Sequence, residues 1–162
     1  MKIAFGLKMR SGKDTCVDYL ISKYGGCKIT FAKPLYEAMY KVQDIFNLPQ
    51  EKDRQFLLMV GDWARQKDDN IFVNLALNNS LFGNKFCSDL RFLIEYKALK
   101  QDGWICVKIN RNTGLPPSEH RSETELDMLK DEDWNYIIDN NGTLEELYDK
   151  LDTIIANILT NV

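Results

Sequence analysis

Three residues suited to binding an anion, Ser11, Gly12 and Lys13, follow closely on a short apolar run at residues 2–5. A triphosphate is bound by unobstructed backbone N–H groups at a helix N-terminus, together with a mobile ammonium group. Gly12 lets the backbone approach an anion closely, and Lys13 supplies a compact cation. An amphipathic pattern follows over residues 13–24. The segment therefore predicts a strand, a phosphate-binding loop and a helix.

The loop departs from the pattern GxxxxGK[ST] in two places. Leu7 stands where the first glycine belongs, with Gly6 one residue earlier, and Asp14 stands where the pattern has a hydroxyl residue. Asp14 can hold Mg²⁺ directly or through water, which leaves Thr15 to bond an inner phosphate. We expect Lys13 to face the solvent. The structural alternative is a plain strand-to-helix turn with surface lysines.

The composition favours one compact domain over residues 1–162. The chain has 162 residues and a net charge of -3, which argues against general nucleic-acid binding. It contains no apolar run near the ~20 residues of a membrane span. Met1 leads directly into the loop, so we expect no signal peptide. The four cysteines lack metal-site spacing, which favours a reducing, cytoplasmic location: Cys16, Cys27, Cys87 and Cys106.

Short apolar runs alternate with helical patterns along the chain. The runs predict strands at residues 2–5, 27–31, 85–89, 104–109 and 134–139. Helices are predicted at residues 13–24, 34–46, 51–63, 69–81, 92–101 and 122–130, and a capping box at Thr143 begins the last one. The alternation predicts an α/β fold with a five-stranded, doubly wound parallel sheet. Residues 34–81 form a helical insertion, and residues 110–121 form a polar loop that could close as a lid.

Other charged residues lie where strands end or segments meet. Asp89 ends a predicted strand, the position at which P-loop enzymes place the group that organises Mg²⁺, although aspartate also caps helices. Lys33 lies between a predicted strand and helix, and Arg54 and Arg65 flank a helix of the insertion. For His120, in the polar loop, we expect a solvated position.

Seven segments, taken in order, resemble deoxynucleoside monophosphate kinases of the bacteriophage type. The resemblance covers nearly the whole chain. The segments are SGKDT (11–15), FAKPL (31–35), DRQFLLMVGDWAR (53–65), SDLRFLIE (88–95), INR (109–111), EHRSETEL (119–126) and IIDNNGTLEEL (137–147). SGKDT is shared with animal-type phosphomevalonate kinases, so the ordered set is the more specific signal.

The resemblance implies ATP-dependent phosphorylation of a deoxynucleoside monophosphate on a P-loop, adenylate-kinase-like fold. It implies that the ATP phosphates and Mg²⁺ are bound by Ser11, Gly12, Lys13, Asp14 and Thr15, with Asp89 as a further metal candidate. The monophosphate would be held by Lys33, Arg54 and Arg65. Asp89 and Arg91 would lie where the two ligands meet, and Arg111 and Arg121 would act from the lid. The expected partners are small nucleotides, without nucleic acid or membrane, and a homodimer stays open.

Two alternatives remain open at this stage. One is a kinase of another small phosphorylated acceptor, such as phosphomevalonate or dephospho-coenzyme A. Aromatic residues that bind a base would favour a nucleotide, and Trp63 and Phe72 are candidates, although both residue types are more often core. The other is a P-loop module that binds a nucleotide without catalysis. The presence of Lys13, Asp89 and several arginines together argues against such a module.

Overall fold

The computed structural model describes residues 1–78, 82–114, 116 and 118–160. The chain divides into two compact units, and each is described by itself. The first unit comprises Met1–Ile29 and Leu81–Val162, and the second comprises Thr30–Ser80.

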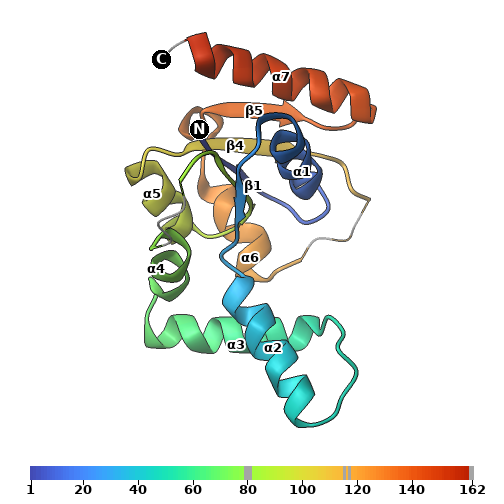
Figure 1. Cartoon of the computed structure of the whole chain (residues 1–162), viewed down its shortest axis with the longest axis vertical. Helices are drawn as coiled ribbons and strands as arrows, with labels where there is room; N and C mark the ends of the chain where they lie inside the picture. The colour runs from blue at the N-terminus through green and yellow to red at the C-terminus, as the bar shows by residue number, and fades with distance from the viewer. Residues whose placement is uncertain (79–81, 115, 117, 161–162) are drawn as a thin grey trace. The chain divides into compact units, whose positions relative to one another are not determined.

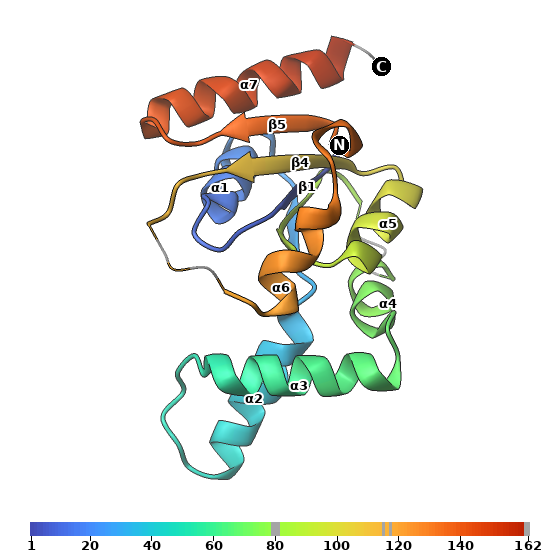
Figure 2. The ribbon, with the colours of Figure 1, turned by 180° about the vertical axis from the view of Figure 1, so that it is seen from behind.

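The first unit is built on one sheet. Within the described residues its strands are β1 (Lys2–Gly6), β2 (Cys27–Ile29), β3 (Lys85–Leu90), β4 (Ile105–Asn110) and β5 (Tyr136–Asp139). The order is β2-β3-β1-β4-β5, and every neighbouring pair is parallel; the arrows of β4 and β5 in Figure 2 run the same way. This confirms the predicted α/β P-loop kinase fold. Because the strands are parallel, their carboxyl ends share one edge.

Helices cover both faces of this sheet. Ile3 and Phe5 of β1 are buried in one cluster with side chains of α1 (Lys13–Tyr24) and α7 (Leu144–Thr160). Figure 1 shows α7 along the edge strand β5 with α1 next to it. Ala4, between the two large residues, faces the other side because side chains alternate along a strand. On that side α5 (Leu93–Gln101) lies against β4.

The segment after the polar loop is less regular than predicted. Instead of one helix over 122–130, it has a short α-helix, α6 (Arg121–Thr124), and two 3₁₀ turns, η1 (Glu125–Met128) and η2 (Asp131–Asp133). Such short pieces are typical connectors. The strand predicted at 27–31 is also shorter, since β2 ends at Ile29.

The second unit contains α2 (Lys33–Ile45), α3 (Arg54–Lys67) and α4 (Ile71–Leu77). The prediction of helix 34–46 ran one residue too far, since Phe46 is 70% exposed beyond the end of α2. The prediction of 51–63 was displaced, because Asp53 caps α3 by accepting a hydrogen bond from the Phe56 N–H at 2.9 Å. The predicted helix 69–81 shortens to α4, and its end at Leu81 lies outside the described residues.

None of the helices in the described ranges combines the length and the apolar character that a membrane span requires.

Candidate functional site

The loop between β1 and α1 has an unusual backbone. Leu7, Arg10 and Gly12 all have positive φ, at 94°, 60° and 102°. Leu7 thus adopts, without being glycine, a conformation that favours glycine. Gly6 has a different reason to be glycine, since a Cβ there would lie 2.6 Å from Cη2 of Trp134. The two departures from the sequence pattern therefore leave a sharply turned loop in place.

Gly12 is fixed by a close neighbour as well as by its backbone. A Cβ on Gly12 would lie 2.4 Å from Nδ2 of Asn140, just after β5. That amide donates a hydrogen bond to the Ser11 carbonyl at 2.8 Å and is buried with it. The N-cap residue of α1 is Gly12, which has no side chain to cap the first N–H groups of the helix. The helix start therefore offers donors to an anion.

Lys13 is buried, which contradicts the prediction that it faces the solvent. It is the first residue of α1 and only 5% exposed. Its Nζ donates to the Leu7 carbonyl at 3.1 Å, to the Lys8 carbonyl and to Ser11 Oγ at 3.3 Å. Burial is the main cause that lowers the pKa of Lys13 to about 8, helped by the charge of Arg91 and opposed by nearby carboxylates. The loop closes around the amine because its carbonyls are the acceptors.

Asp14 is held by groups from two strands. Its Oδ1 accepts hydrogen bonds from Lys28 Nζ on β2 at 2.6 Å and from Ser88 Oγ on β3 at 2.7 Å. Burial opposes its charge, but these bonds outweigh burial and keep the pKa of Asp14 below its usual range. Within the described residues, no group of three or more His, Cys, Asp or Glu side chains forms a ready metal centre.

Asp89 and Arg91 follow Ser88 at the carboxyl end of β3. Asp89 Oδ1 accepts from Cys87 Sγ at 3.2 Å, and the Asp89 charge acts on both Lys13 and Lys28. The structure therefore brings Lys13, Asp14, Asp89 and Arg91 into one electrostatic neighbourhood. The backbone N–H of Arg91 donates to the buried Glu95 Oε2 at 2.9 Å.

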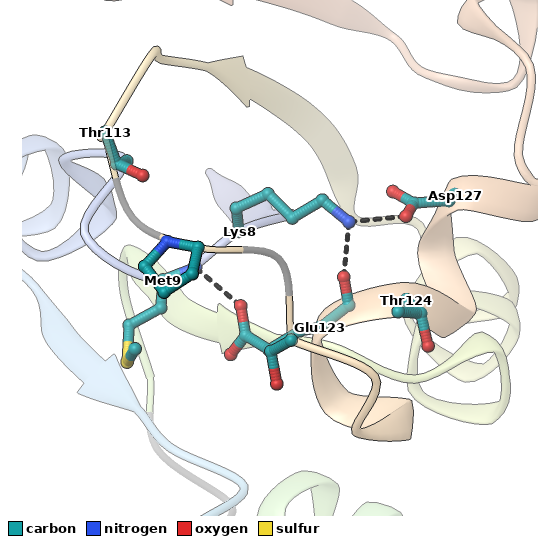
Figure 3. Close-up of a pocket in the computed structure, with 8 residues that line it drawn as sticks. Lys8, Met9, Thr113, Glu123, Thr124 and Asp127 are labelled. Carbon is teal, nitrogen blue, oxygen red and sulfur yellow. Dashed lines mark hydrogen bonds and ion pairs between the residues drawn. The ribbon is translucent and has the colours of Figure 1, made fainter.

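A pocket of about 410 Å³ lies beside the loop, between residues 8–9 and the segment 113–127. Figure 3 shows Glu123 among the lining residues, beside Met9 and Lys8, and its Oε2 accepts from the Met9 N–H at 2.8 Å. Lys8 Nζ reaches the Glu123 carbonyl and the Asp127 carboxylate. The loop between β1 and α1 is thus joined to α6 and η1 by main-chain and side-chain hydrogen bonds.

The two predicted lid arginines lie at the ends of the polar loop. Arg111 is exposed directly after β4. Arg121 begins α6 and donates from Nε and Nη2 to Glu125 Oε2, at 3.1 and 2.9 Å. His120 is half-buried rather than solvated, because its Nδ1 accepts from the Ser122 N–H at 3.2 Å and caps α6. Of the predicted loop, positions 115 and 117 lie outside the described residues.

The second unit holds the other three predicted cations. Lys33 begins α2 and is exposed, with Glu37 Oε1 at 3.7 Å, and Arg54 begins α3 and is exposed. Arg65 is half-buried, with its guanidinium 4.6 Å from the ring centroid of Phe72. Phe72 is buried and Trp63 is 58% exposed, so only the tryptophan has an open face for a base.

Sequence reasoning missed Lys28, Glu123 and Asn140. Lys28 was a strand residue of no special type, and Asn140 belonged to a turn signal. Glu123 lies within EHRSETEL, a segment in which only Arg121 was predicted to act on a ligand. The signal that the sequence offered for Glu123 was its spacing of four residues from a second acidic residue, Asp127.

Comparisons with known proteins give two relatives, both viral. The chain is 29% identical to a protein of Acanthamoeba polyphaga mimivirus named "putative deoxynucleotide monophosphate kinase", over 91% of this chain and 92% of that protein. It is 38% identical to an uncharacterized protein, ORF77, of Ictalurid herpesvirus 1, over 80% of this chain, but it spans only 60% of that protein's length. No family model matches the chain.

Proposed function

We propose that this chain is an ATP-dependent kinase that phosphorylates deoxynucleoside monophosphates to the diphosphates. The observation that carries the proposal is the buried ammonium of Lys13, hydrogen-bonded to three neutral oxygens at the start of a helix whose N-cap residue is glycine. In the described part of the chain the hydrogen-bond acceptors of this ammonium group are all neutral, so it can exchange them for charged phosphate oxygens, which bind it more strongly. The name of the mimivirus relative supports the same activity.

The residues present fit both a triphosphate and Mg²⁺. Gly12 leaves the backbone of the helix start without a side chain, and Ser11 and Thr15 bring hydroxyls to either side of Lys13 and Asp14. Asp14 and Asp89 provide carboxylate oxygens for the metal. A bound Mg²⁺ would neutralise charge on the phosphate oxygens.

The reaction needs cations in place more than it needs a nucleophile from the protein. In phosphoryl transfer, charge spreads over the transferred group, so positioned cations provide most of the catalysis. Lys13 and Arg91 serve this purpose at the loop, and Arg111 and Arg121 serve it from the lid. Lys33, Arg54 and Arg65 hold the acceptor phosphate.

The test is a measurement of ADP formation from MgATP against a panel of dNMPs, NMPs and phosphomevalonate. Turnover of one or more dNMPs, and its loss by orders of magnitude in Lys13→Met, is the expected result. Methionine keeps the apolar stem of the lysine and removes its charge, so the variant isolates the ammonium. Turnover of phosphomevalonate alone, or ATP binding without any turnover, would replace this proposal by one of the alternatives.

A further inference from the structure

The buried carboxylate of Glu123 lies between the guanidinium of Arg91, which follows β3, and the backbone N–H of Met9, in the loop after β1. Its side chain is 7% exposed, and Oε1 pairs with Nη1 of Arg91 while Oε2 accepts the Met9 N–H at 2.8 Å. One carboxylate therefore joins the phosphate loop to the residue that follows β3.

The backbone of Glu123 is held as firmly as its side chain. The Glu123 N–H donates to the His120 carbonyl at 2.8 Å, and its carbonyl accepts from Lys8 Nζ. Both carboxylate oxygens and both backbone groups thus have partners. A buried carboxylate in such a network is costly to displace, because any partner it loses leaves a charge or a donor unpaired.

Arg91 needs such a support. Its backbone is fixed by Glu95, but an arginine side chain has many rotamers and loses considerable entropy when it is held in one. Its guanidinium also lies close enough to Lys13 for the two cations to repel, and the Glu123 carboxylate counteracts this repulsion. Without a carboxylate at this point, the arginine would turn toward the solvent.

We propose that Glu123 is a positioning residue for phosphoryl transfer: it holds the Arg91 guanidinium beside the phosphate loop, so that the two anion-binding groups stay in register. This inference rests on the proposed kinase function. Glu123 touches neither ligand and acts through Arg91.

The test compares Glu123→Gln with wild type in steady-state kinetics and in thermal unfolding. Glutamine keeps the shape and the hydrogen bond to Met9 but removes the charge that pairs with Arg91. We expect kcat to fall by roughly tenfold to a hundredfold, with both KM values within about threefold of wild type. Asp152→Asn is the matched control. Asp152 lies on α7, outside the site, and it also accepts hydrogen bonds from several side chains, including Tyr19 Oη at 2.9 Å. Its kinetics should equal those of wild type.

A double-mutant cycle with Arg91→Ala separates positioning from a merely structural role. If Glu123 acts through Arg91, Arg91→Ala lowers kcat and the added Glu123→Gln change lowers it no further. Additive losses overturn the inference, and so does a normal kcat or a loss that only follows the unfolded fraction. Tighter acceptor binding in Glu123→Gln also overturns it, because the carboxylate would then compete with phosphate.

Three further outcomes can also be interpreted. If Glu123→Gln does not fold, Glu123→Asp carries the same test, since it keeps the charge but shortens the reach to Arg91, and its kcat should fall without a change in KM. An inactive wild type overturns the proposed function and, with it, this inference. An active wild type with an indifferent Glu123 overturns this inference alone.

Discussion

Lys13 carries a charge in a place where proteins rarely keep one. Its side chain is 5% exposed, and its partners are two carbonyls and a hydroxyl. Burial, aided by the charge of Arg91, lowers the pKa of Lys13 from 10.5 to about 8. Keeping Lys13 protonated therefore destabilises the folded state, and a bound anion would reduce this destabilisation.

This cost predicts a dependence of stability on pH. Between pH 8 and 10.5 the unfolded chain binds a proton at Lys13 that the folded chain does not, so the free energy of unfolding rises with pH across this window. The gain is complete above 10.5 and is lost as pH falls through about 8. The gain between pH 8 and 10.5 is roughly 3–4 kcal/mol, at about 1.4 kcal/mol per pKa unit.

The measurement is urea unfolding of wild type and Lys13→Met at several pH values, without nucleotide or metal. Methionine does not titrate, so the difference between the two proteins isolates Lys13 from all other groups. As pH rises, the free energy of unfolding of the wild type should increase relative to that of Lys13→Met. A difference that stays constant from pH 7 to 10.5 would contradict the burial of a charged amine.

Gly12 and Leu7 both have positive φ, but substitutions at the two positions should change the free energy of unfolding in opposite directions. Gly12→Ala places a Cβ 2.4 Å from Asn140 Nδ2 at a φ of 102°, and we expect it to lower the free energy of unfolding by roughly 1–3 kcal/mol. Leu7→Gly removes a side chain from a φ of 94° and should be neutral or stabilising. Urea unfolding of both variants checks this. Equal stability of Gly12→Ala and wild type would show that the loop is free to shift.

The helices α5 and α7 both begin with a glutamate that accepts backbone N–H groups, but one glutamate is buried and the other is exposed. At α5, Glu95 Oε2 accepts the N–H groups of Arg91 and Phe92, at 2.9 and 3.1 Å, and the glutamate is 2% exposed. At α7, the exposed Glu146 Oε2 accepts the Thr143 N–H at 3.0 Å, which confirms the capping box predicted there.

The comparison predicts unequal costs for the same substitution. Glu95→Ala leaves two N–H groups without an acceptor next to a buried side chain, and we expect a loss of about 2–3 kcal/mol. Glu146→Ala exposes its donor to water, and we expect about 0.5–1 kcal/mol. Chemical unfolding of the two variants measures both values. Similar losses would mean that propensity rather than burial sets the cost of a cap.

The strands and the long helices were predictable because their signals are local. Apolar runs and amphipathic periods fixed α1 and α7 to within a residue of their observed starts. The α3 start was misplaced since the cap is Asp53, and only geometry distinguishes it from neighbouring acidic residues.

The candidate site was predictable only in part, for a different reason. Ser11, Gly12 and Lys13 are consecutive, so their spacing is visible in the chain. The partner of Arg91 is Glu123, and the partners of Asp14 come from β2 and β3. Such pairings depend on strand order, which a single sequence does not reveal. The burial of Lys13 was missed because the carbonyls that receive it turn inward only in the folded loop.

The four cysteine thiols lie on α1 and on three strands of the sheet, so their reactivity reports on how the first unit opens. Cys16, Cys87 and Cys106 are buried on α1, β3 and β4, whereas Cys27 on β2 is half-buried. Burial raises the pKa of Cys16 and of Cys106 to about 12 and that of Cys87 well above its ordinary value. At pH 8, a thiol with a pKa of about 12, such as Cys16 or Cys106, is ionised in about one molecule in ten thousand. The thiolate is the reactive form.

A thiol reagent such as DTNB at pH 8 should therefore modify one cysteine per chain rapidly, and Cys27→Ser should abolish that phase. The other three should react only as fast as the unit opens, and all four should react in denaturing urea. Because the protected thiols lie on α1, β3 and β4, their rates report whether the sheet and its helix open together. Distinct rates for the three would mean that the unit opens in parts, and a fast reaction at Cys87 or Cys106 would contradict a sheet covered on both faces.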